Sequence, residues 1–255
     1  MAARLPGPQW RHLALTRKMK QIPLALTPDG QPSFETFIAA DNAAAVNHLR
    51  TLTWPQAPVY LWGETGSGKT HLLQAMAHRV QSAGPPIGWF AAGSALPWTV
   101  LPHWAMVVID DCHALDSAEQ QAAFALFIEA ASLGIQVLSA GRLPPIDLLL
   151  REDLRTRLAW GHVFAMHSLS EEQTRAALRL EADRRGIFLS DDVMDFLLTR
   201  FARDLKYLMA LLDGLDEFAL STSRHVTVPL LKQMLAESNL GRSKQGSSGL
   251  STTCS

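Results

Sequence analysis

The sequence predicts an α/β fold in which a parallel sheet is flanked by helices and followed by a small all-α domain. Three observations predict it. An apolar stretch at 58–62 runs directly into a glycine-rich loop and then into a helical pattern. Short apolar strands alternate with helical segments through about residue 167, which is typical of a parallel sheet. From there to about residue 238 only helical signals occur.

The strands of the sheet are expected at short apolar runs. The run at 105–109 is unbroken and ends in Asp110 and Asp111, as a strand buried on both faces should look. The helix after the glycine-rich loop is expected at 69–82. Ser117 with Gln120 resembles a capping box that opens a helix through Ser132. The other expected strands are 58–62, 87–92, 135–139 and 162–166.

The helical domain has its own start and stop signals. Ser170 and Gln173 form a second capping-box pattern, and Gly186 should end that helix. Later helices are expected from Ser190 through Phe201, over 203–220, and from Pro229 to Ser238. The predicted domains are a flexible amino-terminal segment at 1–32, an α/β domain at 33–167, a helical domain at 168–238 and a disordered tail at 239–255.

Composition bounds the class of protein. The 255 residues carry a formal net charge of -1, and 47% of them are hydrophobic, so the chain can bury a core but has no global attraction to nucleic acid. Cys112 and Cys254 have no partners at metal-ligand spacing. No apolar run is long enough for a bilayer, and no signal peptide is evident, so we expect a cytoplasmic protein without membrane contact.

A complete P-loop pattern predicts a nucleotide site. Its glycines let backbone N–H groups turn toward phosphate oxygens, and the start of the following helix adds a positive dipole end. Lys69 should bind the β and γ phosphates, and the Thr70 hydroxyl should bind Mg²⁺, so the cofactors are ADP or ATP with Mg²⁺. The predicted nucleotide-binding residues here are Gly63, Glu64, Thr65, Gly66, Ser67, Gly68, Lys69, Thr70 and His71.

Two carboxylates follow the strand at 105–109. The carboxyl ends of parallel strands meet at one edge of a sheet, which places Asp110 and Asp111 beside the P-loop. Asp110 should hold Mg²⁺ together with Thr70. Asp111 should orient the water that attacks the γ-phosphate.

These residues carry a resemblance to a known family. The P-loop with the His-Leu-Leu that follows it, and Val-Val-Ile-Asp-Asp at 107–111, resemble the AAA+ domain of the bacterial replication initiator DnaA. Residues 34–37 and 41–45 resemble the segment of that family that lies against the adenine. The resemblance covers about 21–236 and implies a bacterial AAA+ protein with a helical lid. We expect no counterpart of the DNA-reading helix-turn-helix domain of DnaA.

A short peptide before the AAA+ region resembles a sliding-clamp-binding motif. Residues 21–26 read Gln-Ile-Pro-Leu-Ala-Leu, with Ile22 and Ala25 departing from the usual Leu and Pro. The groove-filling side chains would be Gln21, Ile22, Leu24 and Leu26. This layout is that of the Hda family, the regulatory inactivators of DnaA. It implies a regulator that binds the polymerase sliding clamp (beta subunit), reaches DNA through the clamp and promotes hydrolysis of ATP bound to DnaA. Whether the chain forms a homo-oligomer stays open.

The same resemblance implies an arginine finger. Residues 154–161 resemble the family's finger segment, in which Arg157 would act in trans on ATP bound to DnaA. Two positions depart from the family. Arg142 stands near the aspartate of sensor I, and Lys206 stands at the nucleotide-binding arginine of sensor II. Both departures indicate a weak intrinsic ATPase that activates hydrolysis by DnaA.

Two other interpretations stay open. An independent AAA+ ATPase, acting on DNA as a helicase loader or initiator relative, would bind DNA without the clamp and in a salt-dependent way. A non-catalytic adaptor would use nucleotide only to fold. In that case Arg157→Ala would leave its function intact, whereas deletion of 21–26 would abolish it.

Overall fold

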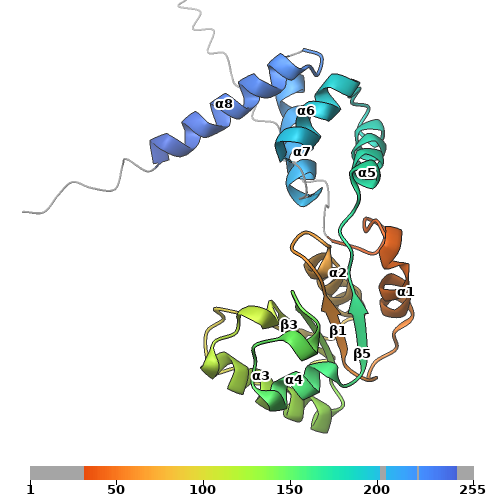
Figure 1. The fold of residues 1–255 in the computed structure, drawn as a ribbon, viewed down its shortest axis with the longest axis vertical. Helices are drawn as coiled ribbons and strands as arrows, with labels where there is room; N and C mark the ends of the chain where they lie inside the picture. Colours follow the sequence, from red (N-terminus) through yellow and green to blue (C-terminus); the bar gives the residue numbers. More distant parts are fainter. Residues whose placement is uncertain (1–31, 202–204, 223, 246–255) are drawn as a thin grey trace, which may run out of the picture. The chain divides into compact units, whose positions relative to one another are not determined.

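The computed structural model describes residues 32–201, 205–222 and 224–245, with side chains through Glu237 except that of Lys206. Five parallel strands form one sheet in the order β2-β3-β4-β1-β5 (Figure 1). They are β1 (Val59–Trp62), β2 (Ile87–Ala91), β3 (Met106–Asp110), β4 (Gln136–Gly141) and β5 (His162–Ala165). A parallel sheet flanked by helices and followed by further helices confirms the predicted fold class.

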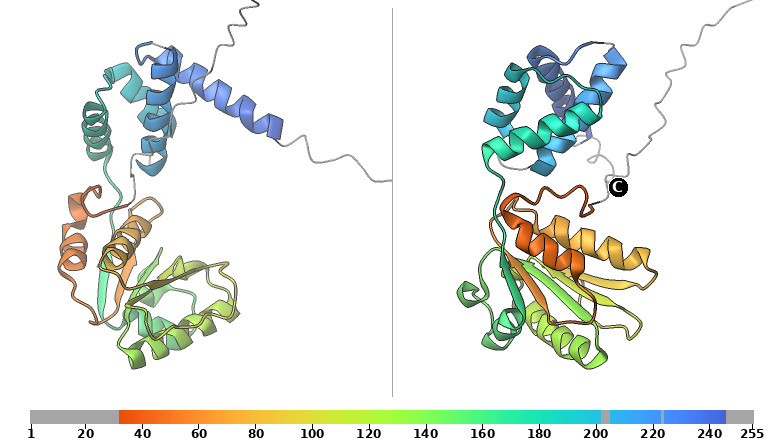
Figure 2. Two further views of the ribbon diagram at one scale, coloured as in Figure 1. Left: turned by 180° about the vertical axis from the view of Figure 1, so that it is seen from behind. Right: turned by 90° about the vertical axis from the view of Figure 1, so that its right-hand side faces the viewer.

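Helices cover both faces of the sheet (Figures 1 and 2). Because successive strand residues point to opposite faces, Leu61 packs in the core under α1 and α2, whereas Tyr60 packs in the core under α3 and α4. The four helices are α1 (Ala43–Thr51), α2 (Lys69–Ser82), α3 (Ser117–Leu133) and α4 (Glu152–Ala159). Three short 3₁₀ helices join them: η1 (Ala40–Asn42), η2 (Cys112–Ala114) and η3 (Pro145–Asp147).

The start of α3 differs from the expectation. Its N-cap is Asp116, whose carboxylate accepts from the backbone N–H groups of Ala118 and Glu119, while Glu119 accepts from the Asp116 N–H at 2.9 Å. The predicted pair of Ser117 and Gln120 is therefore wrong by one position. The sequence offers two overlapping capping-box patterns, one residue apart: Asp-x-x-Glu and Ser-x-x-Gln. The charged pair forms the stronger hydrogen bonds at a helix start, so the helix begins after Asp116.

The remaining helices build a separate hydrophobic core. They are α5 (Glu171–Arg184), α6 (Asp191–Phe201), α7 (Leu205–Thr222) and α8 (Val228–Gln245). The predicted capping box of Ser170 and Gln173 is confirmed, and Gly186 follows α5 in a left-handed conformation, with φ +71°. The expected end of the last helix at Ser238 is wrong, because α8 continues to Gln245. The predicted domain boundaries at 32/33, 167/168 and 238/239 stay predictions.

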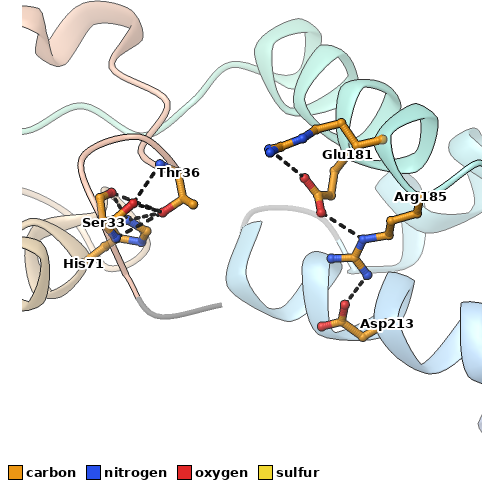
Figure 3. Close-up of polar contacts among 7 residues, drawn as sticks. Ser33, Thr36, His71, Glu181, Arg185 and Asp213 are labelled. Atoms are coloured by element: carbon orange, nitrogen blue, oxygen red, sulfur yellow. Dashed lines mark hydrogen bonds and ion pairs between the residues drawn. The ribbon is translucent and has the colours of Figure 1, made fainter. Parts of the chain in front are cut away.

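Ion pairs tie α5 to its neighbours. Arg185, the residue directly after α5, pairs with Glu181 on that helix and with Asp213 on α7 (Figure 3). Arg175 reaches Asp195 on α6 at 2.5 Å. Exposed pairs of this kind contribute little singly, so the apolar core supplies most of the stability of this part. Within the described ranges no helix is long and apolar enough to cross a membrane.

Candidate nucleotide site

The P-loop connects β1 to α2 and needs glycine at two places where the chain passes close to a neighbour. At Gly68 φ is +89°, and a Cβ would lie 2.5 Å from Cε2 of Phe37. At Gly63 φ is +155°, and a Cβ would lie 2.2 Å from the carbonyl oxygen of Met166. The loop therefore wraps tightly only because neither residue carries a side chain.

The Lys69 side chain is held inside the loop. It is 7% exposed, and its ammonium donates to the carbonyl oxygens of Gly63 at 2.8 Å and Glu64 at 2.7 Å, and to Ser67 Oγ at 3.3 Å. Burial lowers the pKa of Lys69, while Asp110 and Asp111 oppose that shift. The amine thus sits where phosphate oxygens would accept its hydrogen bonds.

Thr70 and Asp110 meet as predicted for two Mg²⁺ ligands. The Thr70 hydroxyl donates to Asp110 Oδ2 at 2.8 Å, and the Asp111 N–H donates to Asp110 Oδ1 at 2.9 Å. Burial raises the pKa of Asp110, and these two hydrogen bonds oppose the rise. No cluster of three His, Cys, Asp or Glu side chains suited to a metal occurs in the described part of the chain. The oxygen pair nevertheless fits Mg²⁺, which commonly takes one or two protein oxygens and completes its shell with phosphate and water.

Asp111 follows β3 with its side chain exposed and its backbone in the left-handed region, with φ +51°. It directly precedes η2, which contains His113 close to the same end of the strand. Burial is the main cause that lowers the pKa of His113; the charge of Asp111 opposes this shift, and the charges of Arg142 and Lys69 add to it. His113 carried no sequence signal, because a lone histidine after an aspartate pair fits no metal or catalytic spacing.

A leading segment crosses the start of α2. Its Thr36 Oγ1 lies 3.3 Å from Nε2 of His71, and the same nitrogen lies 3.0 Å from the Ser33 carbonyl oxygen (Figure 3). The Phe37 ring lies 5.4 Å from the His71 ring. This segment thus brings polar groups and an aromatic ring beside the P-loop, where the resemblance predicts the adenine.

Asn42, the last residue of η1, joins the leading segment to the chain after β5 by two hydrogen bonds. Its side-chain amide donates to the His167 carbonyl oxygen at 2.9 Å and accepts from the His167 N–H at 2.7 Å. This residue carried no sequence signal. Its partner lies 125 positions away, so no local pattern marks it.

The predicted finger residue Arg157 lies elsewhere, in the last turn of α4. After that turn the chain passes through Gly161 to the start of β5, where the His162 N–H donates to the carbonyl oxygen of Pro58, the residue before β1, at 2.9 Å. Arg157 is therefore near the amino-terminal edge of the sheet, whereas Lys69 and Asp110 are at the carboxyl edge. Glu64, Thr65 and Gly66 are exposed in the loop. Lys206 lies in the first turn of α7, but its side chain is outside the described part, as are Gln21, Ile22, Leu24 and Leu26.

Comparisons with known proteins agree with this fold. The family model "Bacterial DnaA ATPase domain" matches residues 29–87, and the model "Hda, lid domain" matches residues 171–235. An uncharacterized protein of Haemophilus influenzae is 32% identical over 227 residues, which is 85% of this chain and 98% of that protein.

Solved structures share the fold at low sequence identity. Domain III of the Thermotoga maritima replication initiation protein DnaA matches with a TM-score of 0.64 and 19% identity, over 82% of this chain and 97% of that chain. AMPPCP-bound DnaA from Aquifex aeolicus matches with a TM-score of 0.59 and 21% identity, over 74% and 65%. The Thermotoga maritima RuvB branch migration motor matches with a TM-score of 0.58 and 14% identity, over 80% and 71%.

The sheet order, the P-loop and the carboxylate at the end of β3 define a P-loop protein of the AAA+ class. Within that class, the two family models make the assignment specific. The chain belongs to the Hda-like, DnaA-related AAA+ proteins.

Proposed function

We propose that this chain binds adenine nucleotide with Mg²⁺ at its P-loop and stimulates hydrolysis of ATP bound to DnaA by inserting Arg157 into the DnaA site. In this role it is a negative regulator of replication initiation. Residues 21–26 dock it on the sliding clamp, and it contacts DNA through the clamp.

The position of Arg157 is the observation that supports action in trans. The P-loop follows the carboxyl end of β1, and Arg157 lies near the other end of the same strand. A strand of four residues spans roughly 13 Å. The finger and the chain's own phosphate loop therefore face different edges of the sheet, so one nucleotide bound at the P-loop is separated from its own Arg157.

Arg157 is also available for a partner. Its side chain is half-buried, and among the described residues it makes no hydrogen bond or ion pair. Arg151, at the start of the same helix, is instead engaged by Asp153 at 2.7 Å. A guanidinium fork can bind two phosphate oxygens and offset the negative charge that develops on them during hydrolysis.

At the chain's own site each residue has a proposed role. Lys69 binds phosphate oxygens, and His71 with the leading segment faces the base. Thr70 and Asp110 hold Mg²⁺, which neutralises phosphate charge when bound. Asp111 orients water, and Lys206 adds a positive charge from the helical lid. Lysine lacks the arginine fork, which is consistent with weak intrinsic hydrolysis.

Single-turnover hydrolysis of ATP preloaded on DnaA tests the proposal. The chain is added with ADP and clamp-loaded DNA, and the wild type is compared with Arg157→Ala and Arg155→Ala. Arg155 is the matched control because it lies on the same helix and has no partner among the described residues. We expect Arg157→Ala to lose nearly all stimulation, since fingers of this kind contribute on the order of 10³-fold or more in GTPases. Arg155→Ala should keep most of it.

Two further results separate the alternatives. Replacement of Gln21 and Leu24 by alanine should abolish stimulation on clamp-loaded DNA. No stimulation by the wild type, together with turnover of its own ATP, would instead indicate an independent ATPase. Stimulation that survives Arg157→Ala but not the clamp-peptide change would indicate a non-catalytic adaptor.

A further inference from the structure

α1 places a histidine against the edge strand β5 (Figure 1). The ring of His48 lies 4.2 Å from the ring of His162 and 5.1 Å from that of Phe164, both on β5. Its Nε2 is buried and has no hydrogen-bond partner in the described structure. A protonated imidazole carries a charge and two N–H donors, so burying it there costs more than burying the neutral ring. The contact between α1 and β5 therefore favours a neutral His48.

The groups around His48 do not favour a proton either. Burial, and then the charge of His162, lower the pKa of His48 below its ordinary 6.5. The leading segment, η1, α1 and α2 supply the other charged or titratable side chains of the elements around it: Glu35, Asp41, Arg50, Lys69, His71, His78 and Arg79. Neither carboxylate in this set is a cause that raises the pKa of His48. A proton on His48 therefore lacks a compensating negative charge from these elements.

α1 continues a stretch of chain that reaches the phosphate loop. Before this helix, the Phe37 ring occupies the space in front of Gly68, inside the P-loop. Asn42, the residue before α1, exchanges two hydrogen bonds with the backbone of His167. His48 lies roughly 9 Å further along the helix axis. Because the stretch is continuous, a shift of α1 away from β5 moves the segment that packs on the phosphate loop.

We propose that protonation of His48 loosens α1 from β5 and thereby weakens the binding of adenine nucleotide at the P-loop. Nucleotide binding by this chain is then sensitive to acid. This coupling rests on the nucleotide site of the proposed function and adds a regulation to that site. Linked equilibria are reciprocal, so bound nucleotide in turn disfavours the protonated form of His48.

The pKa of an unburied histidine sets an upper limit on the effect. While α1 is packed on β5, the pKa of His48 lies below 6.5, and it returns toward that value when α1 loosens. Well above pH 6.5 both forms are neutral, so the affinity for nucleotide does not depend on His48. At about pH 5.5 a loosened histidine is protonated in a ratio of about ten to one, so the affinity can fall by at most about tenfold.

Titration of the full-length chain with Mg²⁺-ADP at about pH 7.5 and at about pH 5.5 tests the coupling. We expect the wild type to lose about threefold to tenfold more affinity on acidification than His48→Phe, which keeps an aromatic ring beside Phe164 but takes up no proton. Protonation of ADP itself affects both proteins alike, so the difference between them is the measured quantity. His78→Gln changes an exposed histidine on α2 and should follow the wild type.

An NMR titration of the imidazole C–H signals gives a second measurement on the wild type. Saturation with Mg²⁺-ADP should lower the pKa of His48. Equal losses of affinity in the wild type and His48→Phe, or a His48 pKa that ADP does not change, would overturn the coupling and leave the nucleotide site intact. Absence of ADP binding by the wild type at about pH 7.5 would overturn the site itself.

Discussion

Gly68 is required for two reasons, its backbone conformation and the packing of Phe37 against it. Its φ of +89° favours glycine, and the Phe37 ring occupies the space where a side chain would begin. The leading segment and the phosphate loop can approach each other only because this position has no Cβ. The glycine thus allows the leading segment to pack directly on the phosphate loop.

Gly68→Ala and Gly93→Ala separate the free-energy cost of the backbone conformation from the cost of the clash with Phe37. Gly93 also has a positive φ, +83°, but a Cβ there would meet nothing within 4 Å. Gly93→Ala should therefore cost only the backbone strain, about 1–2 kcal/mol. Gly68→Ala should cost about 1–3 kcal/mol more because Phe37 must move, and it should lose nucleotide binding. Urea unfolding of both variants checks this, and equal costs would show that the Phe37 contact is unimportant.

Among the elements, α3 is stabilised at its start by a complete capping box. Asp116→Ala should destabilise the protein by about 1 kcal/mol, the usual cost of losing such an N-cap. Ser117→Ala is the matched control, since Ser117 is the first helical residue and should change stability by only a few tenths of a kcal/mol. Thermal unfolding of the two variants measures the difference. A larger effect at Ser117 would restore the sequence-based assignment of the cap.

α1 packs on the edge strand β5 through two histidines. The ring of His48 lies 4.2 Å from that of His162, and His48 Nε2 is buried without a hydrogen-bond partner in the described structure. Burial, and then the charge of His162, lowers the pKa of His48 below its ordinary 6.5. The unfolded chain thus binds more protons near that pH. This stabilising contribution is complete above pH 6.5 and is lost as pH falls through the folded pKa.

The pH dependence of stability tests this histidine pair. We expect His48→Phe, which keeps an aromatic ring beside Phe164, to lose less stability than the wild type on acidification from about pH 7.5 to about pH 5.5. His78→Gln changes an exposed residue on α2 and should follow the wild type. If His48→Phe lost as much stability as the wild type, the pair would not be a source of acid sensitivity.

Local patterns explain which elements could be predicted. Apolar runs located all five strands, and the P-loop pattern located α2, because each signal is contained in a few consecutive residues. α1 and α4 were missed: α4 is only eight residues long and its buried Leu154 and Leu158 are too few to show a period. At the site, Thr70 and Asp110 were predicted to meet and do so at 2.8 Å. Phe37 over Gly68 and Asn42 with His167 depend on distant partners, so sequence patterns alone could not reveal them.

At the scale of the whole molecule, bound nucleotide should stabilise the fold. Mg²⁺-ADP at about 100 times its dissociation constant adds about 2.7 kcal/mol. For a protein of this size that corresponds to a rise in Tm of roughly 5–10 °C. Lys69→Ala should remove the rise, because Lys69 is the buried cation of the phosphate loop. Thermal melting with and without nucleotide measures it, and the same rise in both proteins would contradict a ligand bound at this loop.

The position of β1 in the sheet has a consequence for the order of events during synthesis. β1 pairs only with β4 and β5, which the ribosome makes later, whereas β2 and β3 pair with each other as soon as both emerge. At roughly 5–20 residues per second, residues 59–62 wait several seconds for residues 136–141, the first of their partner strands to be made. During that time the apolar β1 stretch has no strand to join. A nascent chain halted before β4 should therefore depend on chaperones and lack a formed phosphate loop.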